Sequence, residues 1–175
     1  LMIDVGANIG NHSVGLAGTF DEVHSIEPHP VLFHVLQANI LRNGCGNITA
    51  HNVGLADEDT DGELVESTEH HELGRIKGRS VLAPEVFGLD SETFSRSHDV
   101  KLRSAKDFLE PFGEKLDQAF IKIDVEGFEL NVLKGATSSL SRFRPAVLFE
   151  HDQKRLSGLG LVESDFCNLL HDQGY

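Results

Sequence analysis

The chain has 175 residues, of which 39% are hydrophobic. This length supports one well-packed core and is too short for two ordinary domains, so we predict a single domain over residues 1–175. The formal net charge of −13 argues against binding to nucleic acid or to a membrane surface, because both interactions rely on a positive field.

Predicted strands and helices alternate along the chain. Strands are predicted at residues 1–5, 23–27, 48–55, 119–125 and 146–150. Helices are predicted at residues 14–17, from Pro28-His29-Pro30 to the Asn43-Gly44 pair, at 127–134 and at 162–170. We expect Gly135 to end the third of these helices, because glycine is favoured at a helix C-terminus. The alternation predicts an α/β fold with a doubly wound, Rossmann-like and mostly parallel sheet.

The strand at residues 119–125 is apolar except for Lys122 and Asp124. Such a run is typical of a parallel sheet whose two faces are both covered by helices. An unpaired buried ammonium group is costly, so we expect Lys122 to contact a carboxylate such as that of Glu126 or Glu150.

Residues 57–104 interrupt the alternation. Eight acidic residues and no lysine or arginine lie between Asp57 and Glu72, and basic residues follow directly. We expect a surface excursion in which residues 62–67 and 100–102 pair as an inserted hairpin. Charge runs of this kind are usually solvated, but long excursions at the carboxyl edge of a sheet also form substrate lids, so both interpretations stay open.

The ends of the chain and its cysteines bear on the cellular setting. Leu1 begins inside a predicted strand and Tyr175 stops where another would start, so we expect a piece of a longer protein that lacks terminal strands. No apolar run approaches the roughly 20 residues that cross a bilayer, and no basic leader is present, which predicts a cytoplasmic location. Cys45 and Cys167 lie far apart, so neither a disulfide framework nor a thiolate zinc site is predicted.

The turn after the first strand carries the main cofactor signal. Dinucleotide-binding turns read G-x-G-x-x-G, and their middle glycine lets a pyrophosphate approach the following helix. Here Gly6 and Gly10 flank Asn8 at that middle position, so a cofactor without phosphate, such as S-adenosylmethionine, fits better. Glu27 ends the second strand 21 positions after Gly6, where an acidic side chain binds ribose hydroxyls in such folds. The alternative for Glu27 is an ordinary surface residue before a proline turn.

Five segments, taken together, resemble one known family. They read DVGANIGNHS at residues 4–13, SIEPHP at 25–30, VGLAD at 53–57, IKIDVEGFELNVLKGA at 121–136 and RPAVLFEHD at 144–152. In this order they are similar to the FkbM-type methyltransferases, a class I family that depends on S-adenosylmethionine. The glycine turn alone is a weak signal, whereas the ordered combination is specific.

The resemblance implies a set of site residues. It implies that the methionine end of S-adenosylmethionine is lined by Asp4, Gly6, Ala7, Asn8 and Gly10, and that the ribose is bound by Glu27 with Pro28 and His29 beside it. It also implies adenine contacts from Leu55, Ala56 and Asp57, and places Asp124 and Glu126 at the methyl donor and acceptor. The sheet of this family normally closes with an antiparallel strand pair, and the chain stops before it.

The expected chemistry needs positioning and a base. Methyl transfer is an in-line displacement at a sulfonium, so no nucleophile motif is required when the acceptor is a hydroxyl. His151 is the predicted base, because histidine titrates near neutrality, and Asp124 and Glu126 would orient the acceptor. A structural role for His151 stays open. No metal site is predicted, although the acidic residues after the fourth and fifth strands, with His151, would suit a divalent ion that chelates a diol substrate.

Three functions remain in competition. The favoured one is O-methylation of a small-molecule or carbohydrate hydroxyl, with S-adenosylmethionine as cofactor and neither nucleic acid nor membrane as partner. The second is a nicotinamide-dependent oxidoreductase on the same sheet, which Asn8 disfavours, and the third is a non-catalytic cofactor-binding domain. For the first, we expect residues 57–104 to build part of the acceptor pocket.

Overall fold

Five of the apolar segments pair as one parallel sheet in the computed structural model of the protein, which describes residues 1–67, 80–82 and 94–175. The strands are β1 (Met2–Val5), β2 (Val23–Ile26), β3 (Ile48–His51), β4 (Gly54–Ala56), β5 (Thr60–Ser67), β6 (Ser80–Leu82), β7 (Phe94–Ser104), β8 (Phe120–Ile123) and β9 (Ala146–Phe149). The helices are α1 (Asn11–Leu16), α2 (Pro30–Arg42), α3 (Ala105–Leu109), α4 (Glu129–Phe143), α5 (Gln153–Gly158) and α6 (Glu163–Asp172), with 3₁₀ helices η1 (Ala17–Thr19) and η4 (Glu110–Gln118). The strand order β3-β2-β1-β8-β9 starts at the centre and winds outward in both directions, which confirms the predicted doubly wound fold.

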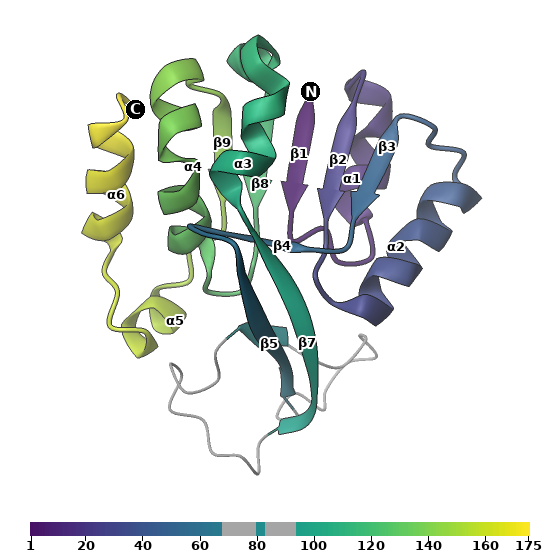
Figure 1. The fold of residues 1–175 in the computed structure, drawn as a ribbon, viewed down its shortest axis with the longest axis horizontal. Helices are drawn as coiled ribbons and strands as arrows, with labels where there is room; N and C mark the ends of the chain where they lie inside the picture. The colour runs from purple at the N-terminus through teal and green to yellow at the C-terminus, as the bar shows by residue number, and fades with distance from the viewer. Residues whose placement is uncertain (68–79, 83–93) are drawn as a thin grey trace.

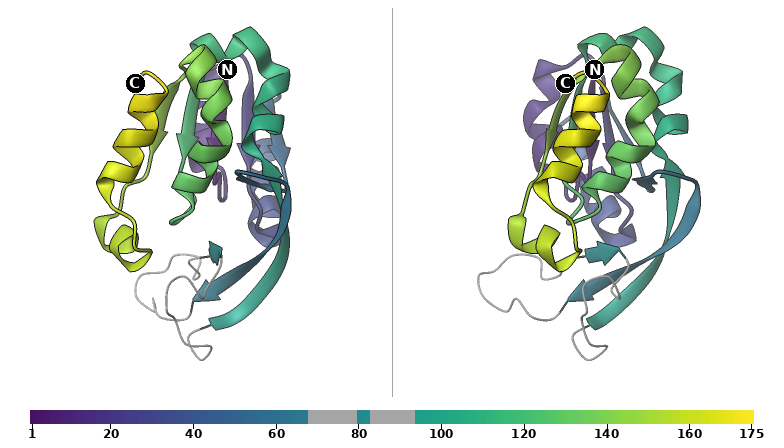
Figure 2. Two further views of the ribbon diagram at one scale, coloured as in Figure 1. Left: turned by 60° about the vertical axis from the view of Figure 1, so that its left-hand side comes forward. Right: turned by 90° about the vertical axis from the view of Figure 1, so that its left-hand side faces the viewer.

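Different helices cover the two faces of this sheet. Figures 1 and 2 show α1 and α2 on one face and α3, α4 and α6 on the other. The main core lies under the second group, where Ile3, Val5, Ile121 and Ile123 pack against Phe108, Leu130, Leu133, Leu140 and Phe166. Successive side chains of a strand point to opposite faces, so Asp4 and Lys122 face α1 instead. None of the helices in the described part of the chain is long and apolar enough to cross a membrane.

A second, smaller sheet extends from the carboxyl edge of the main sheet (Figure 1). Its order is β4-β7-β5-β6, and β5 and β7 pair antiparallel with Gly62 opposite Val100, which confirms the predicted hairpin. Phe128 packs against the small apolar cluster at the base of this hairpin and also against the main core. The hairpin is therefore anchored to the core by a shared aromatic ring. Residues 68–79 and 83–93 of the predicted excursion lie outside the described residues.

The predicted third strand, residues 48–55, is two strands in the structure. β3 belongs to the main sheet and β4 to the second sheet. Between them, the Asn52 side chain donates hydrogen bonds from Nδ2 to the carbonyl oxygens of Glu27 and Pro28, at 2.9 and 3.1 Å. These bonds hold the chain at the point where it leaves the main sheet, a long-range effect that an apolar pattern does not reveal.

Helix α4 does not end at Gly135 as predicted but continues to Phe143. A Cβ atom at Gly135 would lie 2.2 Å from the carbonyl oxygen of Ala56 in β4. The glycine therefore permits a close approach between helix and strand, and it is not a C-terminal cap. The helix ends instead at Arg144, which has a left-handed backbone with φ of 50°. The structure also contains α3 and η4, which the sequence pattern did not predict.

Candidate functional site

The carboxyl ends of four strands bring predicted site residues to one edge of the main sheet. Gly6 follows β1, Glu27 follows β2, Asp124 follows β8 and Glu150 follows β9, and the four strands end in register. Backbone pairing continues past the strands, since the Asp124 amide donates to the Val5 carbonyl oxygen at 3.0 Å. The order of the sheet reverses at β1, and in open α/β sheets such a reversal is where ligands bind.

The glycine turn after β1 is packed directly against the end of β8. Gly6 has φ of 79°, and a Cβ atom there would lie 1.9 Å from the carbonyl oxygen of Asp124. Gly10 has φ of 89°, and a Cβ atom there would meet Leu36 of α2 at 2.6 Å. Asn8 between them is also left-handed, with φ of 54°, a conformation that asparagine tolerates better than most residues. Backbone geometry therefore explains why these residue types occur at these positions.

Glu27 holds this turn in place. Its Oε2 accepts a hydrogen bond from the Asn8 amide and its Oε1 accepts one from the His29 amide, both at 2.8 Å. The side chain is 5% exposed. Burial raises the pKa of Glu27 above its ordinary value, and the two backbone hydrogen bonds oppose that rise. The predicted ribose-binding carboxylate is thus a fixed acceptor group at the sheet edge.

The other predicted cofactor residues lie around the turn at different depths. Asp4, Ala7, His29, Leu55 and Ala56 are buried, Pro28 is half-buried, and Asn8 and Asp57 are exposed. His29 caps α2, because its Nδ1 accepts a hydrogen bond from the Val31 amide at 3.1 Å. The centroid of its ring lies 4.4 Å from that of His98 in β7, which brings the hairpin against this side of the site. The cofactor contacts of these residues stay predictions.

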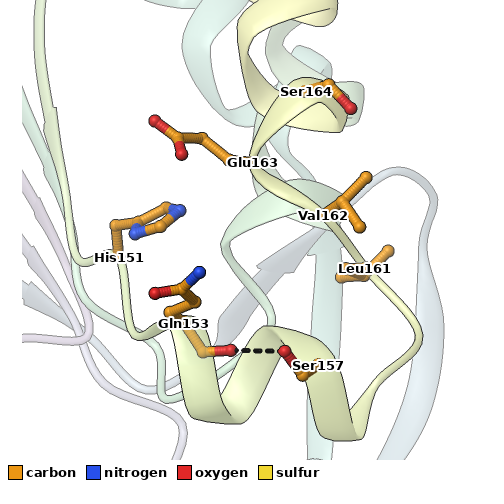
Figure 3. Close-up of a pocket in the computed structure, with 7 residues that line it drawn as sticks. All are labelled: His151, Gln153, Ser157, Leu161, Val162, Glu163 and Ser164. Atoms are coloured by element: carbon orange, nitrogen blue, oxygen red, sulfur yellow. Dashed lines mark hydrogen bonds between the residues drawn. The ribbon is translucent and has the colours of Figure 1, made fainter.

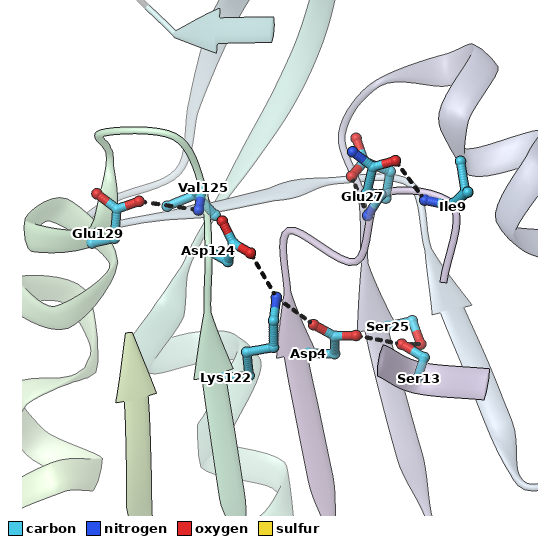
Figure 4. A network of polar contacts seen from close by, with 10 residues as sticks. Asp4, Ile9, Ser13, Ser25, Glu27, Lys122, Asp124, Val125 and Glu129 are labelled. Carbon is cyan, nitrogen blue, oxygen red and sulfur yellow. Dashed lines mark hydrogen bonds and ion pairs between the residues drawn. The ribbon is translucent and has the colours of Figure 1, made fainter. Parts of the chain in front are cut away.

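A buried chain of polar groups runs beneath α1 to the sheet edge (Figure 4). The Ser25 hydroxyl donates to Ser13 Oγ at 2.7 Å, and the Ser13 hydroxyl donates to Asp4 Oδ2 at 2.6 Å. Lys122 Nζ lies 3.2 Å from Asp4 Oδ1 and 3.3 Å from Asp124 Oδ2. One ammonium group thus connects a fully buried carboxylate with a carboxylate at the rim of the site.

These ion pairs correct the expected partners of Lys122. The sequence predicts a carboxylate such as that of Glu126 or Glu150, and the structure pairs the ammonium group with two other carboxylates, those of Asp4 and Asp124. The reason is the strand register, which places Asp4 of β1 directly opposite Lys122 of β8 on the same face. The sheet order makes Asp4 and Lys122 neighbours, so spacing along the chain could not identify that pair. Asp124 lies only two residues after Lys122, and the alternation of side chains along a strand could have suggested it.

Asp124, Glu126 and Glu150 converge at the rim. Each offers one carboxylate oxygen, and these oxygens lie within 4.8 Å of one another. Glu126, in the loop after β8, has a left-handed backbone with φ of 57°. The structure therefore brings together two of the three predicted catalytic residues and adds Glu150. Such a group of oxygens suits a proton acceptor or a divalent cation, and acidic groups commonly converge without an ion.

Glu129 supports this loop, although the sequence pattern did not single it out. Its side chain, in the first turn of α4, is buried, and Oε1 accepts hydrogen bonds from the amides of Val125 and Gly127, both at 3.1 Å. The carboxylate thereby fixes the backbone around Glu126. An acidic residue in the first turn of a helix is a signal that could have suggested this role.

His151 lies on another side of the same strand end. Its ring contacts Phe166 edge-on, with centroids 6.1 Å apart. It lines a pocket of about 280 Å³ between α5 and α6, together with Gln153, Ser157, Leu161, Val162, Glu163 and Ser164. Figure 3 shows His151, Gln153 and Glu163 around this opening. Because Glu150 belongs to the carboxylate group and His151 to the pocket, the two features adjoin at the end of β9.

A pair of histidines packs against the sheet near Glu27. His24 Nδ1 and His51 Nε2 are 2.9 Å apart, and His24 Nε2 lies 3.0 Å from Glu22 Oε1. Phe108 and Phe112 contact the rings edge-on. Burial, then the charges of His24 and Arg103, lower the pKa of His51 to about 4. The His51 carbonyl oxygen accepts the Glu27 amide at 3.0 Å, so this pair supports the strand that carries the site.

We expect the free energy of unfolding to fall as the pH drops from about 6.5 to about 4. In this range a histidine of the unfolded chain takes up a proton, whereas His51 in the folded protein stays neutral, so acid favours unfolding. The expected loss is about 2 kcal/mol after allowance for partial exposure. Urea unfolding at pH 7.5 and pH 4 would measure it in wild type and in His51→Gln, whose loss should be smaller. His34→Gln, an exposed control, should behave as wild type; equal losses in all three proteins would contradict the assignment.

Comparisons with known proteins found a matching family model, a similar sequence and a structure of similar fold. The family model described as "Methyltransferase FkbM domain" matches residues 4–175. Over 144 residues, the chain is 29% identical to a protein named Methyltransferase 1 from Beauveria bassiana (strain ARSEF 2860), with 77% of this chain and 57% of that protein covered. Its fold is similar to the crystal structure of Methyltransferase FkbM from Methylobacillus flagellatus KT, with a TM-score of 0.62 and 23% identity over 98% of this chain and 36% of that one. The chain thus spans little more than half of the curated relative.

Proposed function

The chain belongs to the FkbM family of methyltransferases, and on this premise we propose that it binds S-adenosylmethionine and methylates a hydroxyl of a small-molecule or sugar acceptor. The observation that carries the proposal is the Glu27 carboxylate, which is fixed on the glycine turn at the end of β2. The family match favours this function over a nicotinamide-dependent oxidoreductase, and Asn8 in the turn argues in the same direction.

The residues of the turn fit a nucleoside cofactor without a diphosphate. Each oxygen of the Glu27 carboxylate accepts one backbone hydrogen bond and keeps a lone pair for a ribose hydroxyl. Asp4 would act indirectly, since its buried carboxylate is already engaged by Ser13 and Lys122. Asp124, at the rim, would face the reacting end of the cofactor.

The reaction requires positioning and the removal of one proton. S-adenosylmethionine supplies a methyl group that is bonded to a sulfonium. After in-line transfer of this methyl group, the remainder of the donor leaves as a neutral thioether. The acceptor hydroxyl loses its proton as the new carbon–oxygen bond forms, and a base near neutrality suits that step. His151 is the proposed base, and Asp124 and Glu126 would orient the acceptor through hydrogen bonds. A purely structural role for His151 remains the alternative.

The pocket between α5 and α6 is the proposed entrance for the acceptor. Its lining combines a histidine, an amide, hydroxyls and a carboxylate with two aliphatic side chains. Such a mixture suits a molecule that carries hydroxyl groups on a partly apolar frame. The end of β9 contributes to both features, since Glu150 belongs to the group of rim carboxylates and the next residue, His151, lines the pocket.

The proposal is tested by binding before turnover. Calorimetric titration of the full chain with S-adenosylhomocysteine should give micromolar binding, and NADH should give none. Incubation with methyl-labelled S-adenosylmethionine and a panel of sugars, polyols and polyketide-type alcohols should then transfer label to at least one acceptor. Binding of NADH alone would favour the oxidoreductase. Cofactor binding without transfer to any acceptor would favour a non-catalytic domain.

A further inference from the structure

Lys122 is a buried cation that has no direct role in the proposed reaction. Its side chain is 7% exposed, in a strand that is otherwise apolar. Taking an ammonium group out of water costs several kcal/mol unless the charge is paired. The structure pairs it twice, with Asp4 on one side and with Asp124 on the other. The energetic cost of burying this ammonium group suggests that Lys122 has a specific role.

The two partners of Lys122 differ in exposure and in anchoring. The Asp4 side chain is fully buried and is held by the Ser13 hydroxyl, whereas 37% of the Asp124 side chain is exposed. Asp4 therefore fixes the position of the ammonium group, and the ammonium group in turn fixes the Asp124 carboxylate. Figure 4 shows this sequence of contacts from α1 to the end of β8.

The negative charge around Asp124 explains why its contact with Lys122 is important. Asp124 is one of three converging carboxylates, and its backbone also touches the glycine turn at Gly6. A carboxylate without a nearby cation at this position would attract the sulfonium of the donor as an ion pair. Such attraction would stabilise the bound donor before the reaction and would disappear as its charge is lost, which slows the chemical step.

We propose that Lys122 is a positioning residue that holds the Asp124 carboxylate against β8 and balances its charge, so that the donor is not trapped as an ion pair. This inference rests on the proposed function. Lys122 touches Asp124, and it acts on the donor only through that carboxylate. The role is specific to charge, which distinguishes it from general support of the fold.

The test compares a cationic and a neutral ligand of otherwise similar structure. S-adenosylmethionine has a sulfonium where S-adenosylhomocysteine has a neutral thioether, so a structural defect should weaken both, whereas a charge effect changes their ratio. In Lys122→Gln, the affinity for S-adenosylmethionine relative to S-adenosylhomocysteine should rise about tenfold, because Asp124 has lost its cation. Lys122→Arg keeps the charge and should restore the wild-type ratio. Both ratios come from calorimetric titration, and thermal unfolding confirms that each variant is folded.

Further variants test whether the charge effect passes through Asp124. In Asp124→Asn with Lys122→Gln, the change in ratio should vanish, because the carboxylate that attracts the sulfonium is gone. If Lys122→Gln does not fold, Asp4→Asn with Lys122→Gln removes the buried unpaired charge and should show the same tenfold change. Lys115→Gln, which removes an exposed cation paired with Glu22, should keep the wild-type ratio.

The outcomes distinguish this inference from the proposed function. Wild-type protein that binds neither ligand would overturn the proposed function. Wild-type binding, with an unchanged ratio in folded Lys122→Gln or in the double variant with Asp4→Asn, would overturn only the role of Lys122. A changed ratio that persists after Asp124→Asn would also overturn it, because the charge effect would then not pass through Asp124.

Discussion

Replacing Gly6 by alanine is expected to abolish binding of S-adenosylhomocysteine and to lower the free energy of unfolding by about 3–5 kcal/mol. The new Cβ atom would lie 1.9 Å from the carbonyl oxygen of Asp124, far inside the contact distance of the two atoms. The backbone at Gly6 also has φ of 79°, where a side chain adds strain. Relief requires the turn and the end of β8 to move apart, and both carry proposed donor contacts. Urea unfolding and calorimetric titration measure the two effects.

Gly15→Ala is the matched control for this substitution. Gly15 lies in α1, only nine residues along the chain, and a Cβ atom there meets nothing within 4 Å. Because alanine favours helix more than glycine does, this variant should be as stable as wild type or slightly more stable, with unchanged affinity. If Gly6→Ala behaves like Gly15→Ala, the close packing of the turn against Asp124 is not important for either property.

Replacing Glu27 by alanine is expected to weaken binding of S-adenosylhomocysteine at least about 100-fold, since hydrogen bonds to a charged acceptor contribute about 1.5–3 kcal/mol each. The same change leaves the amides of Asn8 and His29 without their acceptor, so stability should also fall. Glu27→Gln separates the two effects. The glutamine amide keeps one acceptor oxygen but turns an NH₂ group toward the other backbone N–H. The affinity of the Glu27→Gln protein for S-adenosylhomocysteine should therefore lie between those of wild type and the alanine variant.

The control for Glu27 is Glu114→Gln, an exposed carboxylate in η4. It removes the same charge from the chain, so any general effect of net charge on ligand binding appears there too. Calorimetric titration of the four proteins gives the affinities, and thermal unfolding shows whether each variant is folded. Wild-type affinity in a folded Glu27→Ala protein would remove the ribose role and, with it, the observation on which the proposed function depends.

The main sheet could be predicted because its strands are apolar runs with helical segments between them. Strand positions, the parallel pairing and the inserted hairpin all follow from patterns within short windows, and the structure confirms them. The division of the third strand and the passage of α4 through Gly135 depend instead on contacts between distant segments. Asn52 binds the end of β2, and Gly135 faces the backbone of β4. No local pattern encodes such contacts.

The candidate site divides in the same way. Residues that directly follow a strand, such as Glu27 and Asp124, could be identified because parallel strands end at one edge. Most of the groups that hold them could not, since the pairing of Lys122 with Asp4 is set by the sheet order and the role of Glu129 by the fold of its own loop. The direction of His151 toward Phe166 and the α5–α6 pocket likewise depends on tertiary packing.

Phe128 belongs to the hydrophobic core and to the base of the inserted hairpin at once. In engineering terms, this ring marks the boundary between the main sheet and the inserted hairpin. A hairpin transplanted from a relative should be joined beyond Leu64 and before Val100, so that both residues continue to pack with Leu102 near Phe128. Chimeras joined there should stay folded with about the stability of this chain, whereas chimeras joined closer to β4 should lose the packing around Phe128 and unfold at a lower urea concentration.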